Sequence, residues 1–200
     1  MEAAFGADYP ASLDVDSPEQ IARWRPFVQW LLALPHFVVL YALGILSGVV
    51  AVVSWFVILF TGKLPIGLAG VQVMYLRYSN RVTAYAGFLL EPYPPFTFGT
   101  EDRDPGEYAG VRVDFTSQLE DRNRLTTFFR YILAIPHFIA LFFVGIAASV
   151  AWFIGAFAVL FTGSWPEGLR RFVIGSMRWT LRVNAYTVLL TDEYPPFSLD

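Results

Sequence analysis

Two long apolar runs dominate the pattern of hydrophobic and polar positions along the chain. The first lies between Arg25 and Lys63 and the second begins after Arg130; apart from one histidine each, His36 and His137, they contain no acidic, basic or imidazole side chain. Uncharged runs of this length are typical of helices buried in a lipid bilayer. The pattern therefore predicts an α-helical membrane protein.

Each run is longer than one bilayer crossing requires. About 37 residues of α-helix extend about 55 Å, whereas roughly 20 residues cross the 30 Å hydrocarbon core of a bilayer. Two arrangements fit this length. Each run is either one span preceded by a short interfacial helix, or a tight helical hairpin, which in the first run turns between Gly44 and Gly48.

Basic residues flank both ends of each run, and their placement favours the hairpin. A hairpin brings all of them to the cytoplasmic side, where positive charge concentrates, whereas a single span separates them across the bilayer and makes the two halves an inverted repeat. We therefore predict a multi-pass membrane protein with both termini and the inter-repeat linker in the cytoplasm. The flanking residues are Arg23, Arg25, Lys63, Arg77 and Arg81 for the first run, and Arg122, Arg124, Arg130, Arg170, Arg171, Arg178 and Arg182 for the second.

The chain is an internal duplication with a spacing of 101 residues. In a gapless alignment between Arg25 and Leu199, 28 of the 74 residue pairs are identical, which chance similarity of two apolar segments does not explain. We assign residues 1–99 to a first membrane repeat, 100–110 to a linker and 111–200 to a second membrane repeat, and we expect two pseudo-symmetric halves. The shared motifs are Pro-His-Phe at 35–37 and 136–138, Phe-Thr-Gly at 60–62 and 161–163, and Tyr-Pro-Pro-Phe at 93–96 and 194–197.

A helix stop and a nearby proline follow each Phe-Thr-Gly motif, which predicts a second helix in each copy. Its apolar residues fall on one face at helical spacing, and arginines lie at the edge of that face: Arg77 and Arg81 in the first copy, Arg178 and Arg182 in the second. This layout predicts an amphipathic interfacial helix whose arginine stems lie beside lipid headgroups. A helix packed on its own protein is the alternative.

Short alternating segments outside the apolar runs predict strands at residues 11–16, 96–98 and 111–116. Acidic residues concentrate around these segments, so we expect a small acidic β cap against the membrane face. Each repeat then consists of a strand, a helical apolar hairpin, an amphipathic interfacial helix and a strand. The predicted fold class is an α-helical membrane protein with a small β cap and two pseudo-symmetric repeats.

Composition and charge narrow the classes of function. The chain is 56% hydrophobic and 16% charged, which is typical of a bilayer protein. It has no cysteine, which excludes disulfides, thiolate catalysis and cysteine-built zinc or iron–sulfur sites. A net charge of −3 gives no reason to expect a nucleic-acid partner. Residues 1–20 are acidic and polar and lack the layout of a cleaved signal peptide.

The motifs resemble those of a bacterial integral membrane family, domain of unknown function 4389 (DUF4389), over nearly the whole chain. The resemblance implies an integral protein of the bacterial cytoplasmic (inner) membrane, often with tandem copies, and it brings no assigned activity. The first copy departs from the pattern at Lys63-Leu64-Pro65-Ile66, so we expect a site built there to survive only in the second copy. The matching segments include Tyr9-Pro10, Pro35-His36-Phe37, Pro166-Glu167-Gly168-Leu169, Arg182-Val183-Asn184-Ala185-Tyr186 and Tyr194-Pro195-Pro196-Phe197.

His36 and His137 carry the most testable chemistry, because they are the only histidines and occupy equivalent positions in the two copies. Two imidazoles in a membrane bundle could be the axial ligands of a b-type haem, or could serve a proton relay. The simpler hypothesis, which we favour, is a structural histidine that was duplicated. Each ring would then donate a hydrogen bond to a carbonyl freed by the neighbouring proline.

Five arginines form a predicted lipid or anion site. Arg77 with Arg81, and Arg178 with Arg182, are spaced to present two guanidinium groups to one anionic headgroup or phosphate, and Arg171 joins the second pair. A lipid pocket is therefore expected in the second copy. Ordinary anchoring at the cytoplasmic face is the alternative.

The sequence contains no recognisable catalytic constellation or metal site. It lacks a Gly-rich phosphate loop, a His-x-x-x-His pair and a nucleophile elbow, and its carboxylates fit a solvated cap. We therefore predict no enzyme and no cofactor, but a scaffold or accessory subunit that contacts the bilayer, anionic headgroups and partners in a membrane complex. A lipid-binding or small-solute transport module, with its site between the halves, and the haem protein are the alternatives.

Overall fold

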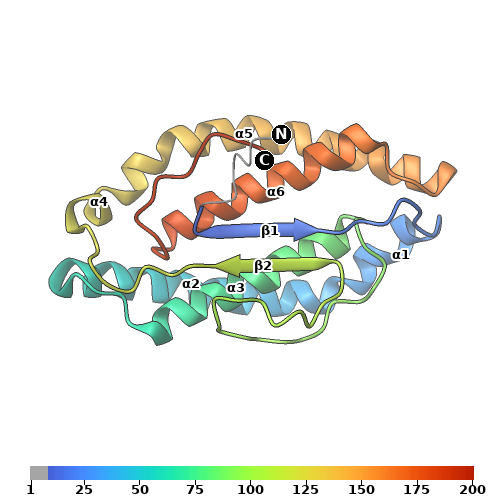
Figure 1. The fold of residues 1–200 in the computed structure, drawn as a ribbon. Coiled ribbons are helices and arrows are strands. Elements are labelled where there is room, and N and C mark those ends of the chain that lie inside the picture. The colour runs from blue at the N-terminus through green and yellow to red at the C-terminus, as the bar shows by residue number, and fades with distance from the viewer. Residues whose placement is uncertain (1–8) are drawn as a thin grey trace, which may run out of the picture.

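The computed structural model describes residues 9–200, and part of the predicted acidic N-terminal segment lies outside this range. The fold is mostly helical, with a small two-stranded sheet and two repeat-like segments (Figure 1). Its elements are β1 (Ala11–Val15), α1 (Arg25–Leu32), α2 (Leu34–Thr61), α3 (Ile66–Ala86), β2 (Val111–Phe115), α4 (Arg124–Phe128), α5 (Arg130–Thr162) and α6 (Glu167–Thr187).

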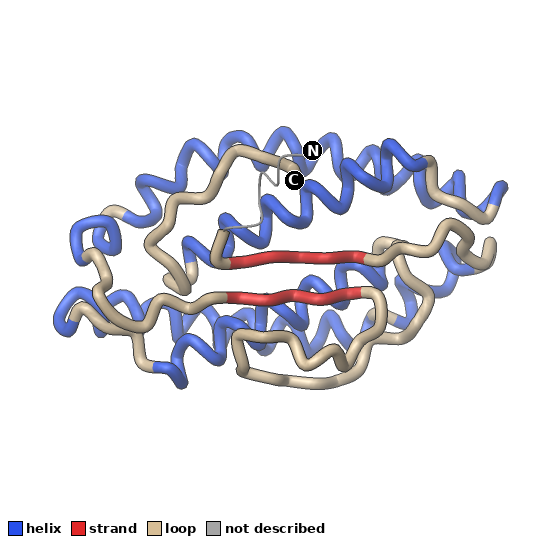
Figure 2. The backbone as a smooth tube through the Cα atoms, in the orientation of Figure 1, coloured by secondary structure: helices blue, strands red, loops and turns tan. Residues whose placement is uncertain are grey.

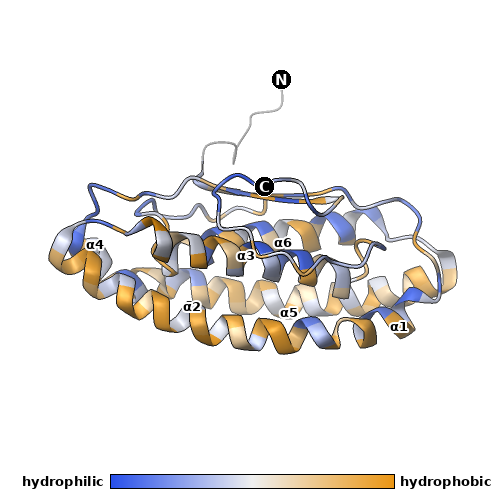
Figure 3. Ribbon diagram, turned by 90° about the horizontal axis from the view of Figure 1, so that it is seen from below, coloured by the Kyte–Doolittle hydropathy of each residue, from blue (hydrophilic) through white to orange (hydrophobic). Residues whose placement is uncertain are grey.

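The elements form three layers, and the axes of the elements are nearly parallel or antiparallel to one another. The sheet and the long loops make one outer layer, α3 and α6 lie in the middle, and α2 and α5 make the other outer layer together with the short helices α1 and α4 (Figures 2 and 3). Hydrophobic residues concentrate on this second outer layer (Figure 3). The molecule is therefore polar on one broad side and apolar on the other.

The main part of each apolar run forms one continuous helix, so the predicted hairpins are wrong. α2 has 28 residues and α5 has 33, and a short helix precedes each, as the single-span alternative expected. Gly44 does not turn the chain, because a helical glycine costs only about 1 kcal/mol relative to alanine. A Cβ at Gly44 would lie 3.7 Å from the Tyr75 hydroxyl on α3, an ordinary van der Waals distance, so the packing does not require a glycine at this position.

The predicted helix stops are confirmed in both copies. Gly62 and Gly163 end α2 and α5 with φ of 71° and 79°, a left-handed conformation that glycine adopts without strain. Pro65 and Pro166 then precede α3 and α6 directly. The Phe-Thr-Gly motif and the proline after it therefore mark the reversal between an outer helix and a middle helix.

The two strands are confirmed close to their predicted bounds, and they link the copies. β1 pairs with β2 in antiparallel register, with Leu13 opposite Val113. β1 packs on α6 and β2 packs on α3, so each strand covers the middle helix of the other copy. The strand predicted at 96–98 is wrong, because this segment has no ladder partner and Phe96 instead stacks on His36.

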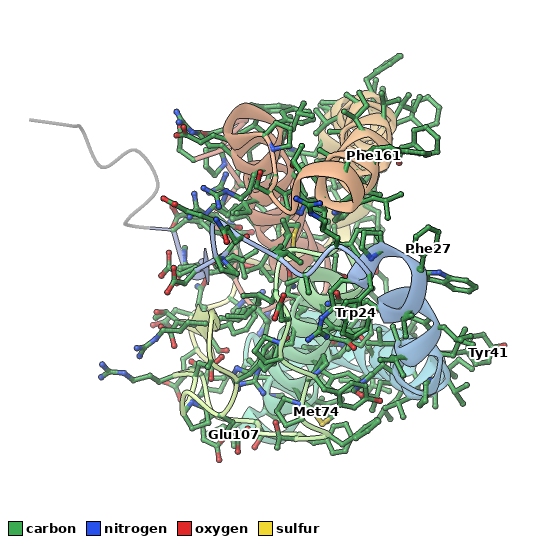
Figure 4. All side chains as sticks on the ribbon, turned by 90° about the vertical axis from the view of Figure 1, so that its right-hand side faces the viewer. Trp24, Phe27, Tyr41, Met74, Glu107 and Phe161 are labelled. Atoms are coloured by element: carbon green, nitrogen blue, oxygen red, sulfur yellow. The ribbon has the colours of Figure 1, made fainter. Side chains whose placement is uncertain are left out.

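The outer helices bury small and polar residues and expose large apolar ones. The buried residues of α2 include His36, Ser47 and Ser54, while Tyr41 and Phe60 are more than 70% exposed. Over the most apolar window only 28% of α2 and 17% of α5 is buried, and both helices are long and apolar enough to cross a membrane. Figure 4 shows Phe27, Tyr41 and Phe161 projecting on one side and Glu107 on the other. The hydrophobic core proper lies between the sheet and the middle helices.

Candidate functional site

His36 lies in an aromatic cluster that joins two motifs of the first copy. Its Nδ1 lies 2.6 Å from the Tyr78 hydroxyl on α3, and its ring stacks on Phe96 at a centroid distance of 4.3 Å. Tyr93 lies 4.7 Å away on another side of the ring. Burial raises the pKa of Tyr78 to about 12, and the Tyr93 hydroxyl adds to the shift, so the Tyr78 hydroxyl stays protonated and available to donate.

The second copy repeats this cluster around His137. Trp179 Nε1 donates to His137 Nδ1 at 3.1 Å, and the ring stacks on Phe197 at 3.9 Å with Tyr194 4.8 Å away. Because an indole N–H can only donate, Nδ1 is the acceptor in this pair. In each copy the Tyr-Pro-Pro-Phe motif therefore covers a fully buried histidine. The sequence alone did not indicate that this motif contacts the Pro-His-Phe motif.

The predicted hydrogen bond from each histidine to a carbonyl freed by proline is replaced by this contact with the adjacent helix. The contacts favour the structural hypothesis, because four of the six aromatic neighbours contribute ring packing alone and only Tyr78 and Trp179 reach Nδ1. A proton relay through Tyr78 would have no counterpart in the second copy, since an indole does not pass protons on at neutral pH. The two clusters therefore do not share the side chains that a proton relay would need.

The structure does not bring the two histidines together. The Ile21 N–H, just before α1, donates to the Gly163 carbonyl at the end of α5. His36 lies shortly after α1, whereas His137 lies 26 residues before Gly163, which is about 39 Å of helix. Figure 1 shows α1 and α4 at opposite ends of the molecule. Within one chain, the two imidazoles therefore cannot bind the same haem iron.

Arg77 and Arg81, predicted to reach lipid headgroups, are buried at 2% and 1% exposure. Arg77 donates to the carbonyls of Gly99, Glu101, Asp102 and Val113, and Arg81 pairs with Asp104 at 2.8 Å. Asp104 also accepts from the Val113 N–H at 3.0 Å. These arginines hold the 100–110 linker and β2 onto α3, so neither is free for a headgroup.

The second-copy arginines divide between the interior and the surface. Arg182 is 3% exposed and donates to the Ser198 and Asp200 carbonyls. Arg178 is partly exposed and donates to the Leu13 carbonyl of β1 at 2.9 Å, and Arg171 is exposed and pairs with Glu167. Arg178 and Arg171 line a 230 Å³ groove beside the 15–17 segment, together with Arg170. Anion binding by this groove stays a prediction.

A buried ion cluster around Asp192 was missed by the sequence analysis. Arg122 pairs with Asp192 at 2.8 Å, Arg130 is in direct contact with the same carboxylate, and the Asn123 N–H donates to it at 2.7 Å. Arg130 also donates to the Thr191 carbonyl and lies 4.1 Å over the Tyr186 ring. The cluster fastens the end of the chain to the start of α5.

The pKa of Asp192 lies below its ordinary value. Burial on its own raises this pKa, but hydrogen bonds from Arg122, the Asn123 N–H and Arg130 outweigh the burial. The carboxylate is therefore charged at neutral pH and compensates two buried guanidinium groups. The first copy has only some of these contacts. Glu91, the equivalent of Asp192, accepts from the Ala22 N–H, and Gln29, the equivalent of Arg130, donates to the Leu90 carbonyl. The signal in the sequence was the Asp-Glu pair before Tyr194, which the first copy lacks.

Two adjoining cavities lie where the repeats meet. One, of 510 Å³, has mostly apolar walls between α2, α3 and α5. The other, of 430 Å³, lies between α3, α5 and α6 and has polar groups from Asn80, Asn184 and Thr180. The two share Thr83, Ser149 and Trp152. Both cavities therefore have mostly apolar walls between the halves, and the second adds a few polar groups.

Among residues 9–200, no group of three or more His, Asp or Glu side chains could hold a metal ion. The fold and its contacts define a class: a duplicated helical protein with one apolar outer side, buried arginine clusters and a polar cap. Comparison with family models assigns it further, since the model described as a domain of unknown function (DUF4389) matches residues 23–97 and 124–198. The chain therefore belongs to this family, with two tandem copies. Searches of curated proteins and of solved structures gave no match.

Proposed function

We propose that the protein is a non-catalytic, membrane-bound scaffold or accessory subunit of a membrane complex. The observation that carries this proposal is the inverted burial of α2 and α5, which expose 11 and 14 large hydrophobic side chains while each buries its histidine and α2 also buries two serines. Contiguous apolar surface of this extent is typical of contact with lipid or another protein, and not of a free soluble chain. The polar cap on the opposite side is then left for partners in the aqueous phase.

Flotation with lipid vesicles in detergent-free buffer tests membrane binding. We expect the protein to float with the vesicles, and we expect Val49→Asp together with Phe153→Asp on the exposed outer side to reduce the floating fraction strongly. Ser12→Asp on the exposed face of β1 is the matched control and should float like the parent chain. A chain that stays monodisperse in plain buffer and sediments away from vesicles would overturn the proposal.

A lipid-binding module is the second function, and the paired cavities favour it. Their apolar and polar walls fit one acyl chain and one polar group. A Cβ at Gly145, which lines the polar cavity, or at Gly48, which does not, would meet nothing within 4 Å. We expect Gly145→Leu to lose lipid that co-purifies in mild detergent and Gly48→Leu to keep it. Mass spectrometry that finds partner proteins and no retained lipid would instead favour the scaffold.

A further inference from the structure

Hydrogen bonds fix the outer helices, the middle helices and the sheet relative to one another along the helix axis. This alignment restricts the orientation that the molecule can take in a membrane. Ser47 lies at the midpoint of α2, and its carbonyl accepts from Gln72 Nε2 on α3 at 2.8 Å. Slightly more than one turn further along α3, Arg77 Nε donates to the carbonyl of Val113, the central residue of β2, at 3.2 Å. The middle of the sheet therefore lies within about two helical turns of the middle of α2 along the helix axis.

The second copy is aligned in the same way, through the pairing of the two strands. Val113 lies opposite Leu13, the central residue of β1, and Arg178 of α6 donates to the Leu13 carbonyl. If α2 and α5 crossed a bilayer, both strands would lie inside the hydrocarbon core, which extends about 15 Å on each side of its midplane. The outward side of the sheet carries Asp14 and Arg112, which are exposed, and charged side chains at that depth are strongly disfavoured.

The distribution of charge favours the opposite orientation, with the helices parallel to the membrane surface. Residues 23–62 and 124–166, which form the apolar outer layer, contain no Asp or Glu. Arg23 and Arg124 are exposed at opposite ends of this layer, beside the C-terminal glycines of α5 and α2 respectively. Trp24 and Trp30 are half exposed at one end, and Phe128 and Tyr131 at the other. Aromatic and basic residues at the rim of an apolar surface fit the headgroup boundary.

We infer that the protein is monotopic: α2 and α5 lie flat in one leaflet of a lipid bilayer, and the sheet faces the water on the same side. The inference rests on the proposed membrane binding and specifies its geometry. Because α2 and α5 run antiparallel, the pseudo-twofold axis stands normal to the membrane, and both copies present equivalent surfaces to one leaflet. This geometry replaces both predicted arrangements, the multi-pass hairpins and the inverted repeat of single spans.

The absence of cysteine makes the geometry directly measurable, since every introduced thiol is unique. Val38, Ile45 and Val52 are exposed on α2 at spacings of two helical turns. Spin labels at these positions, in chain bound to vesicles of zwitterionic and anionic phospholipid, should give nearly equal depths. A spanning helix would separate adjacent labels by about 10 Å in depth. A label at Ser12 should stay in water in the flat geometry.

Thiol labelling from one side supplies the second measurement. A membrane-impermeant maleimide should modify Arg23→Cys and Lys63→Cys, at the two ends of the first run, equally from the outside of sealed vesicles. Protection of one end, or a depth gradient along α2, would overturn the monotopic geometry while leaving membrane binding intact. Labels shielded equally from lipid and water reagents would overturn it in favour of a second copy of this chain on the apolar side. Failure to float would instead remove the proposed membrane binding itself.

Discussion

At the scale of residues, buried charge in this chain is organised by carboxylates that compensate arginines brought from distant segments. Asp192 receives two guanidinium groups, and Asp104 receives two more from α3. Buried ion clusters of this kind contribute little net stability as a whole, but removal of one partner leaves an uncompensated charge. The single carboxylates are therefore the sensitive positions.

Asp192→Asn should destabilise the fold by about 3–5 kcal/mol at neutral pH, because Arg122 and Arg130 lose their counter-ion. The pKa of Asp192 is depressed in the folded state, so its stabilisation is complete above the unfolded pKa of about 4 and is lost as pH falls through the folded pKa. Thermal unfolding in mild detergent, followed by circular dichroism from pH 7 to pH 2, measures both effects. Asp16→Asn at the exposed end of β1 is the control and should follow the parent curve.

Tyr78→Phe should cost about 1–3 kcal/mol, because it leaves buried His36 Nδ1 without its partner and changes little else. Tyr93→Phe removes a hydroxyl that makes no hydrogen bond to the described residues of the same cluster, so its effect should stay within about 0.5 kcal/mol. Denaturant titration of both variants in detergent measures the difference. Equal stability of the two would show that Tyr78 contributes through its ring alone.

At the scale of elements, each copy depends on a strand that belongs to the other copy, although the sequence divides cleanly into repeats. β1 of the first copy covers α6, and β2 covers α3. The family segments 23–97 and 124–198 exclude both strands. A half chain therefore lacks the strand that covers its own middle helix.

Leu13→Asp should destabilise the second copy by about 4 kcal/mol or more, because Leu13 is 3% exposed under the sheet and an unpaired carboxylate would be buried there. Ser12→Asp on the exposed side of the same strand is the matched control. Limited proteolysis should cut the Leu13 variant within α6 before α3. Simultaneous cleavage of both helices would instead indicate that β1 stabilises the two copies equally.

The sequence predicted the helices and strands better than the tertiary contacts that they make. The duplication, the strands at 11–15 and 111–115, and the helices after Phe-Thr-Gly follow from local patterns. The hairpin failed because Gly44 and Gly48 continue α2, and a linear pattern does not distinguish a helical glycine from a glycine in a turn. Arg77 and Arg81 were misassigned because their partner Asp104 lies more than 20 residues away in a linker that looked solvated. The contact between the Pro-His-Phe and Tyr-Pro-Pro-Phe motifs was also not predicted, because only tertiary packing brings the two motifs together.

At the scale of the whole molecule, the arrangement of layers separates an apolar side from a polar side. The apolar layer has basic residues at both ends, and the cap has exposed basic residues of its own, such as Arg103 and Arg112. A flat orientation places Arg23 and Arg124 together at the headgroups and keeps the cap arginines away from them. Electrostatic attraction to anionic lipid should therefore depend on position and not on net charge alone.

Replacement of both Arg23 and Arg124 by Gln should weaken binding to anionic vesicles by about 2 kcal/mol, roughly 30-fold, since each basic residue at an anionic surface contributes about 1 kcal/mol. Binding to zwitterionic vesicles should change little, and added salt should reduce the difference because the headgroup field is screened within about 10 Å. Arg103→Gln with Arg112→Gln carries the same change in net charge on the cap and should leave both affinities nearly unaltered. Equal losses in the two double variants would mean that the ends of the apolar layer do not lie at the headgroups, and the flat orientation would then fail for the molecule as a whole.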